Sequence, residues 1–154
     1  MSAITMDDKG LIIPCANCGQ KNRTPFARLG ETGTCGKCHA ELPPPGEPFA
    51  IGSEAQFNRL LAESALPFVV DFWAAWCGPC RAVAPELVKV AAQGRGKFLV
   101  GKVDTEAVPA LSQRFEVRSI PMMAVFANGR EAGRTTGARP AADILVFVQQ
   151  VIGK

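Results

Sequence analysis

The sequence lacks any long apolar run, carries little excess of either charge, and holds a single histidine. A membrane-spanning helix needs about 20 consecutive apolar residues, and no run reaches that length. The 17 basic and 14 acidic residues leave a formal net charge of +3, too small to indicate binding to nucleic acid or to a membrane surface. Residues 1–14 also lack the apolar core of a signal peptide. We therefore expect a cytoplasmic protein that binds neither nucleic acid nor membranes.

What the sequence does contain is six cysteines in three pairs, each pair with two residues between its members. Six cysteines in a secreted protein would indicate three disulfides. Close pairs of this kind instead favour metal and redox sites in a reducing compartment.

The first two pairs have the spacing of a structural zinc site. Sixteen residues separate Cys18 from Cys35, so the pattern is C-x2-C-x16-C-x2-C, which is typical of zinc sites. Four thiolates offer Zn²⁺ a tetrahedral ligand set and leave no open position for catalysis. We predict one structural zinc ion, and the alternatives are two disulfides or free thiols. The predicted ligands are Cys15, Cys18, Cys35 and Cys38.

Two glycines and the histidine adjoin these cysteines. We expect Gly19 and Gly36 to supply turn conformations that a Cβ would resist. His39 could replace Cys38 as a ligand, but we expect a bystander, because the thiolate is the better zinc ligand.

A proline-rich stretch divides the chain. Residues 43–48 hold four prolines, which indicates an extended, semi-rigid linker. We expect a small zinc-ribbon module over residues 1–42, with residues 1–12 forming a tail into a strand at 10–13, and a second domain over residues 49–154. The module is too small and too poor in large apolar side chains to build a sufficient core by itself, so metal binding would supply folding free energy. The linker permits a docked or a free module.

The third pair lies where an apolar strand meets a helix. The stretch 67–74 predicts a buried strand, and apolar residues at helical spacing predict a helix over 78–93. Cys77 and Cys80 share one face of the first helical turn, so their sulfurs can be joined or separated with little backbone movement. The unsatisfied N–H groups there favour the reactive thiolate. The arrangement indicates a redox pair; a static disulfide or zinc knuckle is the alternative.

The rest of the chain alternates between strands and helices and then forms a hairpin. This order predicts an α/β domain with a mixed sheet and helices on both faces. Ser53 and Gln56 form a capping-box pattern, and Asn128-Gly129 is typical of a type I′ turn. Helices are expected over 53–64, 108–114 and 141–152, and strands over 97–103, 122–127 and 131–136.

The segment Val70–Cys80, VDFWAAWCGPC, resembles the active-site segment of the thioredoxins at nearly every position. The resemblance covers residues 48–154, and the preceding cysteine module and linker resemble the thioredoxin 2 type. It implies the thioredoxin fold, with a mixed central sheet flanked by helices, after a small zinc-ribbon module. It also implies a protein-disulfide reductase in which Cys77 attacks the substrate disulfide and Cys80 then releases the reduced substrate. Implied partners are disulfide-containing substrate proteins and an NADPH-dependent thioredoxin reductase.

Asp71 is the one charged residue within the apolar strand. Burial is expected to raise the pKa of its carboxyl group. It could be a structural residue neutralised by a lysine or a proton acceptor for Cys80 through water, and we favour the second because perturbed acids cluster at functional sites. The resemblance implies that Lys102 approaches Asp71.

The resemblance also implies a substrate groove. The Ile120–Pro121 bond is expected to be cis and to face the cysteines, so that the backbone there pairs with an extended substrate segment. Gly137 matches the family's glycine in the substrate groove, where a side chain would block the substrate, but it could equally be a turn glycine at the end of a strand. Met122 stands where the family usually has threonine, and we expect a softer, oxidisable rim there. The expected substrate-binding residues are Trp76, Gly78, Pro79, Ile120, Pro121 and Gly137.

Two other functions remain open. One is a disulfide oxidase or isomerase, which the Gly-Pro dipeptide between the cysteines disfavours. The other is a redox-switched, chaperone-like binding protein that acts through the zinc ribbon, because zinc thiolates can be oxidised and lose their metal.

Overall fold

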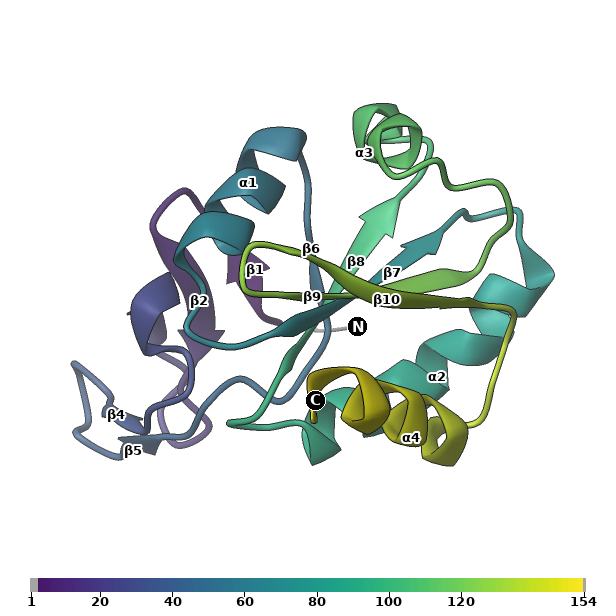
Figure 1. Cartoon of the computed structure of the whole chain (residues 1–154). Coiled ribbons are helices and arrows are strands. Elements are labelled where there is room, and N and C mark those ends of the chain that lie inside the picture. Colours follow the sequence, from purple (N-terminus) through teal and green to yellow (C-terminus); the bar gives the residue numbers. More distant parts are fainter. Residues whose placement is uncertain (1–2, 154) are drawn as a thin grey trace.

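The computed structural model describes residues 3–153 and contains one five-stranded sheet and two small sheets near the N-terminus (Figure 1). The strand order of the large sheet is β10-β9-β7-β8-β6. Strands β6, β7 and β8 are parallel, whereas β9 is antiparallel to β7 and β10 to β9, so the predicted mixed sheet is confirmed. The strands are β6 (Phe49–Ala50), β7 (Phe68–Trp73), β8 (Leu99–Asp104), β9 (Met122–Ala127) and β10 (Arg130–Thr136).

Helices cover both faces of this sheet (Figure 1). Helices α1 (Glu54–Glu63) and α3 (Pro109–Arg114) bury apolar side chains in the core on one face. Helices α2 (Gly78–Gln93) and α4 (Ala141–Ile152) do so on the other. All four helices begin and end within one residue of their predicted bounds. Strand β6 was not predicted, because two residues are too few to show a periodic pattern.

Local signals explain two of the boundaries. The Ser53 side chain accepts a hydrogen bond from the Gln56 N–H at 3.1 Å and caps α1. The Gln56 side chain accepts from the Gly52 N–H at 2.8 Å, one residue earlier than in the usual capping box. Asn128 and Gly129 have φ values of 56° and 78°, as the predicted type I′ hairpin turn requires.

The N-terminal residues form short strands instead of the expected tail. Asp7 accepts hydrogen bonds from the backbone N–H groups of Lys9 and Gly10 at 2.9 and 3.0 Å, which closes a turn between β1 and β2. The expected tail before residue 10 was therefore wrong at Thr5–Met6, which form β1, whereas the other described residues from 3 to 9 belong to no strand or helix. The elements are β1 (Thr5–Met6), β2 (Gly10–Pro14), β3 (Lys21–Pro25), η1 (Phe26–Arg28), β4 (Gly33–Thr34) and β5 (Glu41–Leu42). Residues 1–2 and 154, at the outer ends of the two predicted modules, lie outside the described residues.

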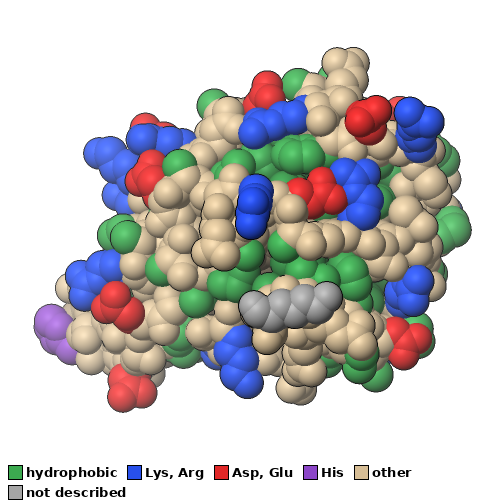
Figure 2. Space-filling model, viewed as in Figure 1, with side chains coloured by type: hydrophobic (Ala, Val, Ile, Leu, Met, Phe, Trp, Pro, Cys, Tyr) green, Lys and Arg blue, Asp and Glu red, His purple; other side chains and the backbone are tan. Residues whose placement is uncertain are grey.

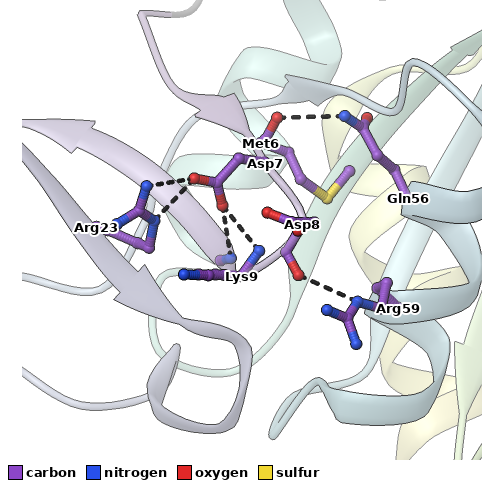
Figure 3. Close-up of polar contacts among 8 residues, drawn as sticks. Met6, Asp7, Asp8, Lys9, Arg23, Gln56 and Arg59 are labelled. Atoms are coloured by element: carbon purple, nitrogen blue, oxygen red, sulfur yellow. Dashed lines mark hydrogen bonds and ion pairs between the residues drawn. The ribbon is translucent and has the colours of Figure 1, made fainter.

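This N-terminal part is docked on the large sheet through a shared hydrophobic core. Leu11, Phe26 and Leu29 are buried in the same cluster as Phe57 and Leu60 of α1. Hydrogen bonds surround the contact. The Ala65 N–H donates to the Phe26 carbonyl at 3.0 Å. Across the same contact, α1 reaches the β1–β2 turn (Figure 3). There the Gln56 amide donates to the Met6 carbonyl at 3.3 Å and Arg59 Nε donates to the Asp8 carbonyl at 3.1 Å.

The proline-rich stretch is also held in place. Arg95 Nη1, just after α2, donates to the Pro44 carbonyl at 2.6 Å. Pro45, Gly46 and Pro48 are buried, and the backbone of Gly46 lies against the Arg95 guanidinium. The stretch therefore packs against Arg95 at the end of α2 and does not act as a free spacer.

No helix within residues 3–153 is both long enough and apolar enough to cross a membrane. Figure 2 shows Lys and Arg side chains interspersed with Asp and Glu over the face in view. This distribution agrees with the small net charge of +3.

Candidate active site and metal centre

The third cysteine pair lies at the start of α2, directly after the loop that follows β7. Cys77 caps the helix: its Sγ accepts the Cys80 backbone N–H at 3.2 Å. The two residues form a disulfide, with Cα atoms 5.2 Å apart, and each is only 4% exposed. Pro79 lies in the first turn, where its missing N–H costs nothing. The reactive pair is thus held by a helix N-terminus, as the pattern predicted.

A second segment, distant in sequence, adjoins the cysteines. The Ile120–Pro121 bond is cis, as expected, and the Ile120 carbonyl oxygen lies 3.8 Å from Cys77 Sγ. The Gly137 N–H donates to the Pro121 carbonyl at 2.9 Å, which places the end of β10 beside this proline. Gly137 has a φ of 91°, so it also satisfies the description of a strand-ending turn glycine. Trp76 is 67% exposed next to Cys77.

Met122 contradicts one prediction. Its side chain is 1% exposed and belongs to the core beneath α1 and α3, so it forms no part of a groove rim. Strand β9 is buried on both faces, so every residue along most of its length is covered. Alternation along the strand places Met122 in the core on the α1 and α3 face and Met123 in the core on the opposite face. The expectation of a soft, oxidisable rim was therefore wrong.

Asp71 is buried at the centre of the sheet and is 1% exposed. Neither carboxylate oxygen has a hydrogen-bond partner in the described structure. Burial raises the pKa of the Asp71 carboxyl group to about 7, and the charge of Lys102 on the adjacent strand opposes this shift. The Lys102 Nζ lies 5.2 Å from the centroid of the Trp73 ring. Lys102 thus acts on Asp71 through its charge alone and forms no ion pair with it.

The other four cysteines converge on one point. Their Sγ atoms all lie within 4.8 Å of one another. Two of the distances, Cys15 to Cys38 and Cys18 to Cys35, are 3.6 Å. A tetrahedron of thiolates with bonds of about 2.3 Å has edges of about 3.8 Å, so the site fits a zinc ion in size and in chemistry.

Each cysteine pair of this site is part of a tight turn. The Gly19 N–H donates to the Cys15 carbonyl at 2.8 Å and the His39 N–H donates to the Cys35 carbonyl at 3.1 Å. Gly19 and His39 have φ values of 80° and 64°. His39 therefore occupies the same left-handed position in the second turn that Gly19 occupies in the first. The expectation for Gly19 is confirmed. The one for Gly36 was wrong, because it is His39 that adopts the left-handed conformation. His39 is exposed and lies outside the four-sulfur cluster.

Electrostatics in this cluster favour a bound cation. Backbone N–H groups of Cys38 and Lys37, with the Asn22 amide, lower the pKa of the Cys35 thiol to about 5. For Cys18 the Gln20 N–H acts in the same direction, but desolvation and the three neighbouring thiols outweigh it and raise the pKa of that thiol to about 11. Four thiols this close cannot all ionise unless a positive charge lies among them.

The chain matches two family models, described as "Thioredoxin" over residues 49–150 and "Thioredoxin 2, N-terminal" over residues 14–40. The chain belongs to the thioredoxin family. It is therefore a thiol–disulfide oxidoreductase with protein-disulfide reductase activity, and Cys77 and Cys80 are its redox pair.

Similarity to individual thioredoxins supports this assignment. This thioredoxin is 40% identical to Thioredoxin C-3 of Corynebacterium nephridii over 140 residues, which is 91% of this chain and 94% of that one. It is 38% identical over 100 residues to a Mycobacterium leprae protein named bifunctional thioredoxin reductase/thioredoxin, covering 65% of this chain and 22% of that one. The crystal structure of chloroplastic thioredoxin z is 32% identical, with a TM-score of 0.63, and the match covers 70% of this chain and 96% of that one.

Sequence reasoning missed three polar side chains of this thioredoxin. The amides of Asn17 and Asn22 donate to the sulfurs of Cys38 and Cys35 at 3.4 and 3.5 Å. Arg81 donates to the backbone just before Cys77. Asn17 and Arg81 each adjoin a cysteine in sequence, and that position was the only available signal.

Proposed function

For the reduction of protein disulfides by this thioredoxin, we propose that Cys77 is the attacking thiolate and Cys80 the resolving thiol. One observation carries the proposal. The two sulfurs meet at a helix N-terminus, beside the Ile120 carbonyl and next to the exposed Trp76. The first helical turn stabilises a thiolate on Cys77, and the resolving thiol lies within reach of it.

The exchange runs in two steps. The Cys77 thiolate attacks one substrate sulfur, so that a mixed disulfide forms and the other substrate sulfur leaves as a thiolate. Cys80 then loses its proton and attacks Cys77 Sγ, which forms the Cys77–Cys80 bond and releases the second substrate sulfur. The substrate gains two electrons and the protein loses two.

We assign proton transfer in the second step to Asp71, acting through water. Support comes from its burial and from a carboxyl pKa of about 7, which lets the group accept and return a proton near neutral pH. In this proposal Lys102 keeps the carboxyl pKa from rising further.

The proposed substrate groove lies around the cis proline. An extended substrate segment would pair with the backbone of Ile120, beside Pro121, because Pro121 has no N–H and its carbonyl already accepts the Gly137 N–H. Trp76, Gly78 and Pro79 would form the facing wall. Gly137 would leave room for the segment, since open space surrounds the position that a Cβ would take there. Main-chain pairing of this kind tolerates many substrate sequences.

For the metal site we propose Zn²⁺ held by Cys15, Cys18, Cys35 and Cys38, in a module of residues 1–42 joined by residues 43–48 to the domain at 49–154. Four thiolates with no open position suit a structural zinc, which supplies folding free energy when bound. The shared core with α1 supports this structural role over a redox-sensing one.

The partner that returns electrons to Cys77–Cys80 is proposed to be an NADPH-dependent thioredoxin reductase. A relative whose name combines thioredoxin reductase and thioredoxin supports this pairing. We further propose a cytoplasmic location and a role in electron transport, because unpaired zinc-binding cysteines need a reducing compartment.

The test uses pre-reduced protein and insulin as the disulfide substrate. Wild type should reduce insulin, Cys77→Ser should be inactive, and Cys80→Ser should accumulate a mixed disulfide detected by mass spectrometry. Trapping by Cys77→Ser instead would reverse the two roles. Equilibration with glutathione gives the reduction potential, and a value as oxidising as that of the isomerases, about −180 mV, would exclude the reductase assignment.

The role of the metal is tested on the full chain with an oxidant titration that follows zinc content and insulin reduction together. We expect zinc to stay bound, or to leave without a specific change in substrate choice. A change in substrate choice or partner binding that coincides with zinc release would instead establish a redox-sensing ribbon.

A further inference from the structure

Arg81, the residue after the redox pair, reaches back over the loop that precedes it. Its Nη1 donates a hydrogen bond of 2.7 Å to the carbonyl oxygen of Ala75. Ala75 lies between β7 and Cys77, immediately before Trp76. The bond therefore joins the first turn of α2 to the loop that carries Trp76.

This loop is anchored at its ends and exposed in its middle. Ala74 is fully buried, Cys77 is 4% exposed, and the Cys77 N–H donates to the Ala74 carbonyl at 3.1 Å. Ala75 is exposed and Trp76 is 67% exposed. Within residues 3–153 the indole of Trp76 forms no hydrogen bond, ring contact or cation–π contact. Exposed segments with few packing contacts are the ones that move most readily.

The position of Arg81 is unfavourable by helix electrostatics alone. A cation near a helix N-terminus opposes the dipole, and acidic residues are preferred there. Local rules tend to be broken at functional sites. The hydrogen bond to Ala75 compensates in part, because the positive guanidinium lies against a carbonyl oxygen that carries partial negative charge. A planar, rigid guanidinium also fixes such a carbonyl better than a flexible ammonium does.

We propose that Arg81 is a positioning residue that fixes the Ala75–Trp76 peptide and thereby holds the Trp76 indole in place for protein substrates. This inference rests on the proposed exchange at Cys77 and Cys80. Arg81 touches no reacting atom. Loss of the Arg81 side chain should therefore impair the reduction of protein disulfides more than that of small disulfides. Protein substrates are expected to contact Trp76, whereas small disulfides reach Cys77 without contacting it.

The test compares Arg81→Ala and Arg81→Lys with wild type, using pre-reduced protein against insulin and against neutral bis(2-hydroxyethyl) disulfide. For insulin, kcat/KM should fall about three- to tenfold in Arg81→Ala through a higher KM, as expected for loss of one exposed, charge-assisted hydrogen bond. The small disulfide should react within about twofold of wild type. Arg81→Lys should recover part of the insulin rate. Arg130→Ala, at the far hairpin turn, removes the same charge and serves as the matched control.

A second readout follows the loop itself. The chain has two tryptophans, so the ¹⁵N–¹H indole signal of Trp76 can be resolved by NMR. Its order parameter should fall in Arg81→Ala and stay at the wild-type value in Arg130→Ala. An unchanged Trp76 signal, or equal losses with both substrates, would overturn the role of Arg81. Wild-type protein that reduces neither substrate would overturn the proposed function instead.

Discussion

Asp71 and Lys102 lie opposite each other in register on the parallel strands β7 and β8, yet they form no ion pair. The ammonium lies over the Trp73 ring, 5.2 Å from its centroid, and the carboxylate oxygens have no hydrogen-bond partner in the described part of the chain. Burial without a hydrogen-bond partner therefore favours the neutral, protonated form of the carboxyl group over the charged form. This is why its pKa reaches about 7, within the range in which thiols exchange with disulfides.

Asp71→Asn should stabilise the oxidised protein above neutral pH. The folded-state pKa of about 7 lies above the ordinary aspartate pKa of 3.8, so wild type loses stability as the pH rises from 3.8 to about 7. Asparagine carries no charge to bury, and we expect a gain of roughly 2–4 kcal/mol at pH 8 that vanishes near pH 4. Urea unfolding at several pH values measures it. A gain independent of pH would contradict the assignment to ionisation.

Cys35→Ser should abolish the proposed zinc binding. It deletes the fully buried member of the proposed ligand set, whose Sγ accepts N–H groups from Lys37 and Asn22, and three cysteines should bind zinc far more weakly than four. We expect metal content to fall from about one zinc per chain to near zero, and Tm to fall by roughly 6–12 °C. Elemental analysis and calorimetry measure these changes. Cys77→Ser is the matched control, and it should keep its zinc.

Phe26→Ala should destabilise the whole protein and not the ribbon alone. Phe26 is 1% exposed in the core shared with α1, and a cavity there should cost about 3–5 kcal/mol. Because the core is shared, thermal unfolding should remain a single transition at lower temperature. Two separate transitions would show that the ribbon unfolds independently. Val88→Ala, which truncates a side chain that is 52% exposed, should change the stability by less than about 0.5 kcal/mol.

Gly46→Ala should loosen the proline-rich stretch. A Cβ at Gly46 would overlap the Arg95 guanidinium, which would have to leave the Pro44 carbonyl. We expect a loss of about 1 kcal/mol in unfolding free energy and faster proteolysis between residues 43 and 48. Gly33→Ala is the control, because open space surrounds its Cβ position and its stability should stay within about 0.5 kcal/mol of wild type. Equal effects of the two substitutions would contradict the role of Arg95.

Sequence reasoning succeeded where the deciding interactions are local. The spacing of the cysteine pairs reflects turn geometry, and the four metal-site sulfurs do converge. Helix bounds depend on a periodic apolar pattern and on caps such as Ser53, all read within a few residues. The burial of Asp71 followed from its apolar neighbours along one strand. The chemistry of the protein was therefore determined by short segments.

Tertiary structure alone decided the relations between distant segments. Whether the ribbon docks depends on Leu11 and Phe26 meeting α1. The inward direction of Met122 depends on a strand covered on both faces, and the ammonium of Lys102 goes to Trp73 because of how β7 and β8 align. Each outcome is a small difference between competing contacts of residues far apart in sequence, and periodic patterns carry no information on such contacts. The sequence thus determined the redox pair and the cluster of four cysteines, while packing decided how the N-terminal part is joined to the rest and which charges face Asp71.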